Sequence, residues 1–412
     1  MSPVIAVFST QAPSHFRLVL PIIVGLARRG ADVRVFTHAR FEPEISRAGA
    51  SLVDVFTPFP QEAADETSTP IGTRYVTHAG RFARAVAAEA ERHRPSLIIG
   101  ETFSVLGRAV AALLGVPWIN VCAGHDLDGE RIVRQMQTDP RVNPSPECLS
   151  AVEALRTILP DASPFAFVTP TSTVLNIHPE PPAFFDPALR QKFEPLAFFG
   201  SLQPPEEAAP AAPEGRYFTD DGRLKLYVCF GTIVWYPFEA QTLTALAAVS
   251  RFVAGRPDIE ALISLGTDRV GAEDRRALAA PNVRVEEYVD QWAVLEEADA
   301  FVTHHGLNST HEAIFQRVPM LSYPFFWDQP ALAERCRRLG VAVPIIDTPR
   351  APIEETRLAA ALDALRNDPA LPGRLQAARQ LELDVIAGRD AVLDRILAIA
   401  EGRRPVMLEK AV

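Results

Sequence analysis

Short apolar runs alternate with longer amphipathic stretches along the first part of the chain. The apolar runs lie at Val4–Phe8, Asp32–Phe36, Leu97–Ile99 and Trp118–Val121, and the amphipathic stretches lie at Leu18–Arg29, Gly80–His93 and Leu106–Leu114. Apolar runs this short predict buried strands, and the longer stretches predict helices. Strands and helices in alternation predict a parallel sheet with helices on both faces. Gly30 and Gly115 follow two of the helical stretches, as expected where helices end.

A proline-rich stretch interrupts this alternation near the middle of the chain. From Leu202 to Pro213 most residues are proline, alanine or glutamate, a composition typical of a semi-extended connector. The alternation then restarts, with predicted strands at Leu224–Phe230, Glu260–Leu265, Val283–Glu286, Ala300–Thr303 and Met320–Tyr323. We predict an N-terminal domain over 1–203, a linker over 204–213 and a C-terminal domain over 214–402, whose last helix can pack back on the first domain. Two doubly wound domains predict a ligand cleft between them.

Composition and charge argue against several classes of protein. The 412 residues are 48% apolar and 22% charged, which suffices for two buried cores. A net charge of −10 with scattered Lys and Arg argues against nucleic-acid or anionic-membrane partners. No apolar run approaches the roughly 20 residues of a membrane span. The four cysteines lie far apart and the N-terminal run lacks the flanks of a signal peptide, so we expect a cytoplasmic protein.

The most informative stretch runs from residue 300 to residue 312. An apolar strand ends at Thr303, and Gly306 allows a tight turn. A helix is predicted to begin near Asn308 or Ser309. The free N–H groups and positive dipole of a helix N-terminus form a site for an anion such as phosphate. His304, at the entrance of the turn, can donate a further hydrogen bond to a phosphate oxygen.

The same residue types also have purely structural interpretations. Ser309 and Glu312 have the spacing of a capping box, in which both side chains bond only the first turn of their own helix. Asp328 and Gln329 stand just before Pro330, as they would at the start of another helix.

Three histidines near this turn raise the alternative of a metal site. His304, His305 and His311 lie at spacings of one and seven residues across a strand-to-helix turn. Side chains at these positions do not converge well on one ion. We therefore expect neither a metal nor a bound cofactor.

Tyr288–Gln291, His304–Glu312 and Asp328-Gln329 together resemble the nucleotide-sugar signature of family 1 glycosyltransferases. This family holds bacterial macrolide and natural-product transferases and the plant and animal UDP-sugar transferases. The resemblance extends over nearly the whole chain in the order and spacing of elements. It implies the GT-B fold, an α/β architecture of two facing Rossmann-like domains. In that fold the C-terminal domain binds the sugar donor and the N-terminal domain binds the acceptor.

Five residues match family positions around the donor diphosphate. His304 matches the histidine that contacts the diphosphate. Gly306, Asn308 and Ser309 match the loop and the helix start beside it. Thr232, in the turn after an apolar run, matches a small hydroxyl residue near the phosphates.

Five further residues match family positions around the nucleoside and the sugar. Tyr288 stands where a tryptophan usually stacks on the nucleobase, and Gln291 follows at the family's spacing. Glu312 matches the acidic residue that bonds the ribose hydroxyls. Asp328 and Gln329 match the pair that bonds hydroxyls of the transferred sugar.

Two residues depart from the family pattern. His305 stands where glycine or cysteine is common, and it can add bulk and charge to the phosphate loop. Asp290 stands where proline is usual. Neither change removes a donor contact, but either can alter donor choice.

His15 is the candidate general base of the N-terminal half. It follows the first predicted strand and precedes a helix, at the edge where open α/β sheets place ligands. A lone histidine there is more often structural, but the family resemblance implies that it takes the proton of the acceptor hydroxyl. In many relatives this histidine is paired with an aspartate that follows the fourth strand. Glu101 follows the corresponding strand here and is one methylene longer, so we predict that it orients His15.

Aromatic residues suited to a flat, apolar acceptor are frequent in this half, although core packing explains them equally well. They are Phe56, Phe59, Phe82, Phe103, Trp118, Phe165 and Phe167, of which Phe59, Phe82 and Phe103 are the candidate acceptor contacts. Asp126 and Asp128 form a D-x-D sequence of the kind that holds a divalent cation in a different glycosyltransferase fold. We interpret it as a loop in which Asp126 can line the acceptor site.

The predicted reaction is inverting transfer of a sugar from a UDP- or dTDP-sugar to a hydroxyl, or another nucleophile, of a small, largely apolar natural product. One alternative is a nucleotide-sugar 2-epimerase or hydrolase of the same fold. Another is a GT-B protein that only binds a partner. We expect no metal requirement, no nucleic-acid partner, no stable membrane insertion, and a monomer or homodimer.

Overall fold

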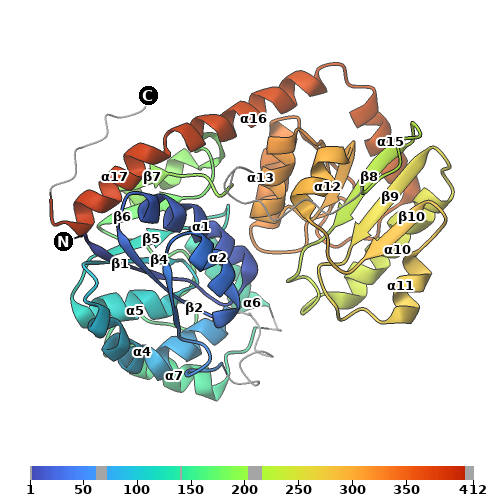
Figure 1. Ribbon diagram of the computed structural model, residues 1–412. Coiled ribbons are helices and arrows are strands. Elements are labelled where there is room, and N and C mark those ends of the chain that lie inside the picture. Colours follow the sequence, from blue (N-terminus) through green and yellow to red (C-terminus); the bar gives the residue numbers. More distant parts are fainter. Residues whose placement is uncertain (1, 62–71, 140–141, 203–215, 404–412) are drawn as a thin grey trace. The chain divides into compact units, whose positions relative to one another are not determined.

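The computed structural model describes residues 2–61, 72–139, 142–202 and 216–403. The predicted linker, 204–213, lies outside these ranges. The chain divides into two compact units (Figure 1). Unit 1 comprises Met1–Ala123, Leu127–Ser201 and Val385–Val412, and unit 2 comprises Gly124–Asp126 and Leu202–Asp384.

Unit 1 is built on a parallel sheet of seven strands in the order β3-β2-β1-β4-β5-β6-β7. The strands are β1 (Val4–Phe8), β2 (Asp32–Thr37), β3 (Ser51–Asp54), β4 (Leu97–Glu101), β5 (Trp118–Val121), β6 (Leu175–His178) and β7 (Leu196–Phe198). Ile5, Ala6 and Val7 of the central strand β1 have no exposed surface, because helices cover both faces of the sheet. β1 lies between β2 and β4. Successive strands of the chain are added on one side of β1 up to β3 and on its other side from β4 onward, so the strand order reverses between β1 and β4. The carboxyl ends of these two strands form the switch point where such sheets bind ligands.

The helices of unit 1 follow the strands in sequence. They are α1 (Pro13–Arg28), α2 (Glu42–Arg47), α4 (Thr73–His93), α5 (Val105–Leu114), α6 (Gly129–Thr138), α7 (Pro146–Arg156) and α8 (Arg190–Phe193). Pro13 stands at the first position of α1, where its fixed φ and missing N–H are harmless. In the described ranges no helix is both long and apolar enough to cross a membrane.

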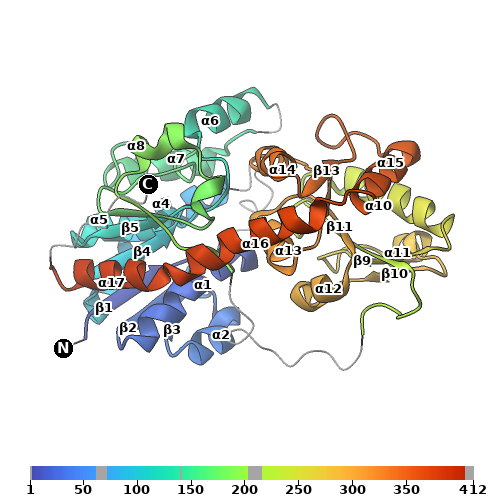
Figure 2. The same cartoon turned by 90° about the horizontal axis from the view of Figure 1, so that it is seen from above.

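A helix from the end of the chain completes unit 1. α16 (Leu371–Ala387) leads into α17 (Arg389–Ala400), which packs on α1 and β7 (Figures 1 and 2). The contact with α1 is close at Gly25, where a Cβ would lie 2.5 Å from Leu393 Cδ1 and would require that side chain to shift. Arg389 donates from Nε to the Phe199 carbonyl at 2.7 Å and from Nη2 to the Gly200 carbonyl at 3.0 Å.

Unit 2 is built on a parallel sheet of six strands in the order β10-β9-β8-β11-β12-β13. The strands are β8 (Leu224–Cys229), β9 (Ile259–Ser264), β10 (Val283–Glu286), β11 (Ala300–Thr303), β12 (Met320–Ser322) and β13 (Ala342–Pro344). The helices are α10 (Glu239–Ala254), α11 (Ala272–Leu278), α12 (Gln291–Glu297), α13 (Leu307–Gln316), α14 (Gln329–Arg338) and α15 (Glu355–Arg366). Thr303 is in register with Cys229 on one side and Ser322 on the other. The switch point of this sheet therefore lies at the carboxyl ends of β8 and β11.

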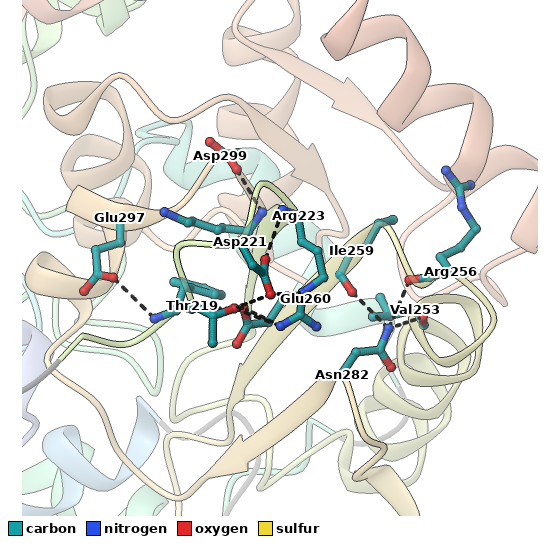
Figure 3. Close-up of polar contacts among 12 residues, drawn as sticks. Thr219, Asp221, Arg223, Val253, Arg256, Ile259, Glu260, Asn282, Glu297 and Asp299 are labelled. Atoms are coloured by element: carbon teal, nitrogen blue, oxygen red, sulfur yellow. Dashed lines mark hydrogen bonds and ion pairs between the residues drawn. The ribbon is translucent and has the colours of Figure 1, made fainter.

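Polar side chains hold together the opposite, amino-terminal end of this sheet (Figure 3). Asn282 Nδ2 donates to the carbonyls of Val253 at 2.7 Å, Arg256 at 3.0 Å and Ile259 at 2.9 Å. Glu260 accepts from the Thr219 N–H at 3.0 Å. These contacts fix the start of the strands and leave the carboxyl ends for ligand chemistry. The two sheets confirm the predicted pair of doubly wound parallel domains.

Candidate functional site

His15 and Glu101 meet at the switch point of unit 1. His15 lies in the first turn of α1, and Glu101 is the last residue of β4, the neighbour of β1. His15 Nδ1 is 3.0 Å from Glu101 Oε2, so the longer glutamate does reach the imidazole. Because a carboxylate only accepts hydrogen bonds, the proton of a neutral His15 stands on Nδ1. That tautomer leaves Nε2 as the ring nitrogen that can take a proton.

Backbone groups fix the Glu101 carboxylate. The Thr10 N–H donates to Oε1 at 3.3 Å and the Phe103 N–H donates to Oε2 at 2.7 Å. The Glu101 side chain has no exposed surface, whereas 21% of the His15 side chain is exposed. The Glu101 carboxylate is thus a buried acceptor of fixed orientation, and solvent or substrate can contact the His15 ring that it bonds.

Phe103, one of the candidate acceptor contacts, lies beside the imidazole. Its ring centroid is 4.6 Å from that of His15 at an interplanar angle of 64°. Tyr75 and Phe167 pack on the other sides of Phe103, at 6.3 and 5.2 Å. Trp118 does not join this cluster, since its ring packs under Arg108 of α5.

Phe59 and Phe82 form a second aromatic group around a histidine that the sequence analysis missed. Their ring centroids are 5.4 Å apart. His78 on α4 stacks on Phe56 at 4.9 Å and meets Phe82 edge-on at 5.3 Å. Its Nε2–H donates to the Phe59 carbonyl at 2.7 Å. Burial lowers the pKa of His78 to about 4, so the ring is neutral near pH 7.

Asp126 and Asp128 of the D-x-D sequence lie in different units of the structure. Asp128 is the N-cap of α6, because its Oδ1 accepts from the Arg131 N–H at 3.0 Å. Asp126 groups with unit 2, whereas Phe59, Phe82 and Phe103 belong to unit 1. Phe165 lines a separate cavity of about 530 Å³ that also contains Arg108, Arg134 and Asp161.

The predicted phosphate loop lies at the switch point of unit 2, between β11 and α13. α13 begins at Leu307, slightly before the predicted start, and no side chain caps its N-terminus at Gly306. The N–H groups of its first turn are therefore not bonded by a capping side chain and retain the capacity to bind an anion. Asn308 and Ser309 lie in this first turn.

His304 is held between two glycine backbones. A Cβ on Gly306 would lie 2.5 Å from His304 Nε2, and a Cβ on Gly231, in the turn after β8, would lie 2.7 Å from the same atom. Both positions therefore need glycine to admit the ring. Burial lowers the pKa of His304 to about 4, against the opposing effect of the Cys229 backbone, so the ring is neutral near pH 7 and carries a single N–H. Thr232, next to Gly231, is exposed in the same turn.

His305 does not add a charge to this loop, contrary to the expectation from the sequence. Its side chain is fully buried, and burial, together with the nearby His304, lowers its pKa to about 3. The bulk also lies below the loop, since Nε2 is 2.8 Å from Ser322 Oγ and Nδ1 is 3.3 Å from Thr310 Oγ1.

The capping-box interpretation of Ser309 and Glu312 is wrong. Both residues lie inside α13, and neither caps it. Gln291, the first residue of α12, instead joins them. Its Nε2 donates to Glu312 Oε2 at 2.5 Å and to Ser309 Oγ at 3.1 Å. Tyr227, which the sequence analysis did not single out, donates from its hydroxyl to Gln291 Oε1 at 3.3 Å.

Tyr288 and Asp290 flank the start of α12. Tyr288 is 62% exposed and free to stack on a flat ring. Asp290 is the N-cap of α12, with Oδ1 accepting from the Trp292 N–H at 3.1 Å and the Ala293 N–H at 3.3 Å. A capping aspartate explains how this chain does without the usual proline.

Asp328 and Gln329 do start a helix, α14, but the side chain of Asp328 does not cap it. Gln329 Oε1 accepts from the Phe325 N–H at 2.9 Å and the Phe326 N–H at 3.3 Å, which fixes the turn before α14. Trp327, which directly precedes Asp328 in this turn, has a φ of +52°. A non-glycine residue in this left-handed region marks a strained turn of the kind found at ligand sites.

The three neighbouring histidines diverge. His304 lies between the glycines and His305 lies under the loop. His311 Nδ1 is 2.6 Å from Glu382 Oε1 on α16, and both side chains are buried. Each ring therefore has its own surroundings.

Two family descriptions match the halves of the chain that carry these groups. Residues 252–388 match the erythromycin biosynthesis protein CIII-like, C-terminal domain, and residues 17–169 match the glycosyl transferase 4-like domain. NDP-glycosyltransferase YjiC of Bacillus subtilis (strain 168) is 22% identical over 396 residues, which are 90% of this chain and 91% of the relative. Oleandomycin glycosyltransferase of Streptomyces antibioticus is 27% identical over 354 residues, 82% and 78% of the two chains.

The same architecture occurs in a solved glycotransferase. The crystal structure of the glycotransferase of kitacinnamycin matches with a TM-score of 0.76 at 23% identity, over 97% of this chain and all of that one. The chain is a GT-B glycosyltransferase. In this glycosyltransferase, the CIII-like match contains three of the candidate donor residues, His304, Glu312 and Gln329. The 4-like match contains Glu101 and begins just after His15.

Replacing Glu312 by glutamine tests whether its carboxylate binds the donor. We expect Glu312→Gln to raise the KM for the donor roughly fivefold, since a hydrogen bond to a charged group is worth about 1 kcal/mol more than a neutral one. The melting temperature should change little, because glutamine keeps the size. The measurement is KM and kcat for the donor beside Tm.

Glu296→Gln is the matched control, because Glu296 is an exposed carboxylate on the neighbouring helix α12. It should leave the donor KM unchanged. An unchanged donor KM in Glu312→Gln would show that Glu312 serves only its contact with Gln291.

Proposed function

We propose that this glycosyltransferase moves a sugar from a UDP- or dTDP-sugar to a hydroxyl of a small, largely apolar natural product, with inversion at the anomeric carbon. The observation that carries the proposal is the bond between His15 Nδ1 and the buried Glu101 carboxylate. It leaves Nε2 of a partly exposed imidazole as a base, beside the ring of Phe103. The relatives above are named as an NDP-glycosyltransferase and an oleandomycin glycosyltransferase, which supports both substrate classes.

The reaction is a single displacement. The acceptor hydroxyl gives its proton to His15 Nε2 as its oxygen forms a bond to the anomeric carbon. The bond from that carbon to the diphosphate oxygen breaks, and the nucleoside diphosphate leaves with the electron pair. Inversion follows because one attack from the opposite face replaces the leaving group. Glu101 stabilises the imidazolium that forms.

The leaving diphosphate needs stabilisation of its growing charge. The uncapped N-terminus of α13 offers N–H groups and a positive dipole end. His304 offers a neutral N–H donor beside it. Tyr288 would stack on the base, Glu312 would bond the ribose, and Asp328 with Gln329 would bond the sugar.

A mass-spectrometric screen tests the proposal. Purified protein is incubated with several UDP- and dTDP-sugars against phenols, macrolides and sterols, and the anomeric configuration of each product is read by NMR. A glycoside with inverted configuration is expected. Free sugar or an epimerised nucleotide without any acceptor would favour an epimerase or hydrolase. Saturable nucleotide binding without turnover of any acceptor would favour a binding protein.

Transfer should need no divalent cation. His304 and the α13 N-terminus would take the part that a carboxylate-bound metal plays in other glycosyltransferases, so a chelator should leave kcat unchanged. Activity that a chelator abolishes and Mg²⁺ or Mn²⁺ restores would contradict this, and would return attention to Asp126.

A further inference from the structure

The turn of the phosphate loop depends on one non-glycine residue in a left-handed conformation. His305 has a φ of +60°. Few residues other than glycine adopt this region, and they persist there only where surrounding contacts hold them. The turn sends two adjacent rings to different places. His304 lies between Gly231 and Gly306, whereas the His305 side chain is fully buried.

His305 connects three elements around that turn, two through its side chain and one through its backbone. Its Nε2 is 2.8 Å from Ser322 Oγ at the end of β12. Its Nδ1 is 3.3 Å from Thr310 Oγ1 on α13. Its backbone N–H donates to Thr303 Oγ1, at the end of β11, at 3.2 Å. All four residues are buried, with at most 2% of their surface exposed.

A neutral imidazole suits these two hydroxyls. It has one N–H donor and one acceptor nitrogen, and each hydroxyl can donate or accept, so both ring nitrogens are satisfied in either tautomer. Removing the ring would leave two buried hydroxyls without their imidazole partner, which costs more than the hydrogen bonds themselves contribute. The network therefore stabilises one conformation of the loop and one position of the α13 N-terminus relative to β11 and β12.

We propose that His305 is a positioning residue for the donor diphosphate, which it never touches. It holds His304 and the first turn of α13 in the geometry that receives the phosphate oxygens. The role rests on the proposed function, since it presumes that this loop binds a nucleoside diphosphate. A glycine would adopt the positive φ of this turn without strain, whereas His305 is held in it by its hydrogen bonds.

The test compares four variants of the full chain. His305→Gly accepts the positive φ but removes the ring, and His305→Asn tolerates the same φ and keeps a short polar group. Ser322→Ala removes one partner and leaves the backbone of the loop unchanged. Ser250→Ala is the matched control, because Ser250 is a buried serine of the same unit whose Oγ donates to the Leu278 carbonyl at 2.7 Å, away from the loop.

The measurements are the Kd for UDP and dTDP by calorimetry, KM and kcat for the donor, and Tm. A buried hydroxyl left unpaired costs enough to weaken nucleotide binding by roughly ten- to a hundredfold where the loop depends on it. We expect that loss in His305→Gly, a smaller loss in Ser322→Ala, and partial rescue in His305→Asn. Ser250→Ala should lower Tm about as much as Ser322→Ala and leave the Kd unchanged.

Each remaining outcome is decisive. If Ser322→Ala and His305→Gly change the nucleotide Kd no more than Ser250→Ala does, His305 is only a stabilising core residue and the proposal fails. A wild-type protein that binds neither UDP nor dTDP overturns the proposed function, and this role of His305 with it.

Discussion

Replacing His15 with alanine is expected to lower kcat for transfer to a hydroxyl acceptor by about 10²–10⁴-fold, the usual contribution of a general base. The loss follows from the geometry, since Nε2 of this ring is the nitrogen left to take a proton once Nδ1 bonds Glu101. The nucleotide Kd should not change, because the candidate donor residues lie in unit 2 and His15 lies in unit 1. Turnover and calorimetric binding of UDP and dTDP measure the two effects.

Glu101 should act through His15. Glu101→Gln keeps the size but loses the charge. Whichever way the amide turns, its NH₂ meets either the Thr10 N–H, or both the Phe103 N–H and Nδ1 of His15. The amide therefore cannot accept from all three groups, and it brings no negative charge to stabilise the imidazolium. We expect Glu101→Gln to lower kcat substantially, and Glu101→Asp, the family's usual residue, to retain more activity.

The double variant decides whether the two residues work as a pair. Once His15 is gone, its orienting partner has nothing left to orient, so the losses should not multiply. A double variant whose loss equals the product of the single losses would show that Glu101 acts independently of His15.

Replacing His304 with alanine should weaken donor binding roughly 10- to 100-fold, because a hydrogen bond to a charged phosphate is worth about 1.5–3 kcal/mol. Both the nucleotide Kd and the donor KM should rise. The pKa of His304 lies near 4, well below its ordinary value, because burial penalises the charged ring. The neutral donor is therefore present throughout the range above about pH 5, and the effect of the substitution should not vary with pH there.

Gly306→Ala tests the position of the same ring without removing it. Gly306 has a φ of −63°, which alanine also adopts, but the added Cβ would lie 2.5 Å from His304 Nε2. The single variant should weaken donor binding nearly as much as His304→Ala does. In the His304→Ala background the same change should cost little, because the ring is absent. Additive losses in this cycle would mean that the glycine serves the backbone of the loop and not the ring.

The arrangement of His15 and Glu101 could be predicted from the sequence. Each follows a short apolar run, and parallel strands place their carboxyl ends at one edge of the sheet. What the sequence leaves open is whether the strands are neighbours, and β1 pairs with β4 only because the order reverses there. The extra methylene of Glu101 does not prevent the contact, since the carboxylate reaches Nδ1.

Other features depend on side-chain packing that spacing does not encode. Ser309 and Glu312 have the spacing of a capping box, yet α13 starts two residues before Ser309, and Gln291 binds both side chains. The charge of His305 was also misjudged. A histidine in a polar loop suggests exposure, and only the positions of Ser322 and Thr310 show that the ring points into the core.

Unit 1 is not a continuous stretch of chain. Arg389 on α17 bonds the Phe199 carbonyl across 190 positions of sequence, and Leu393 covers Gly25 of α1. A ribosome releases α17 only after Leu202–Asp384 has been made, so this face of α1 stays uncovered during synthesis of unit 2. A chimera that joins residues 1–201 to the C-terminal half of another glycosyltransferase must therefore also keep α17. A gene fragment that stops at Ser201 would yield a protein with an exposed apolar stripe on α1.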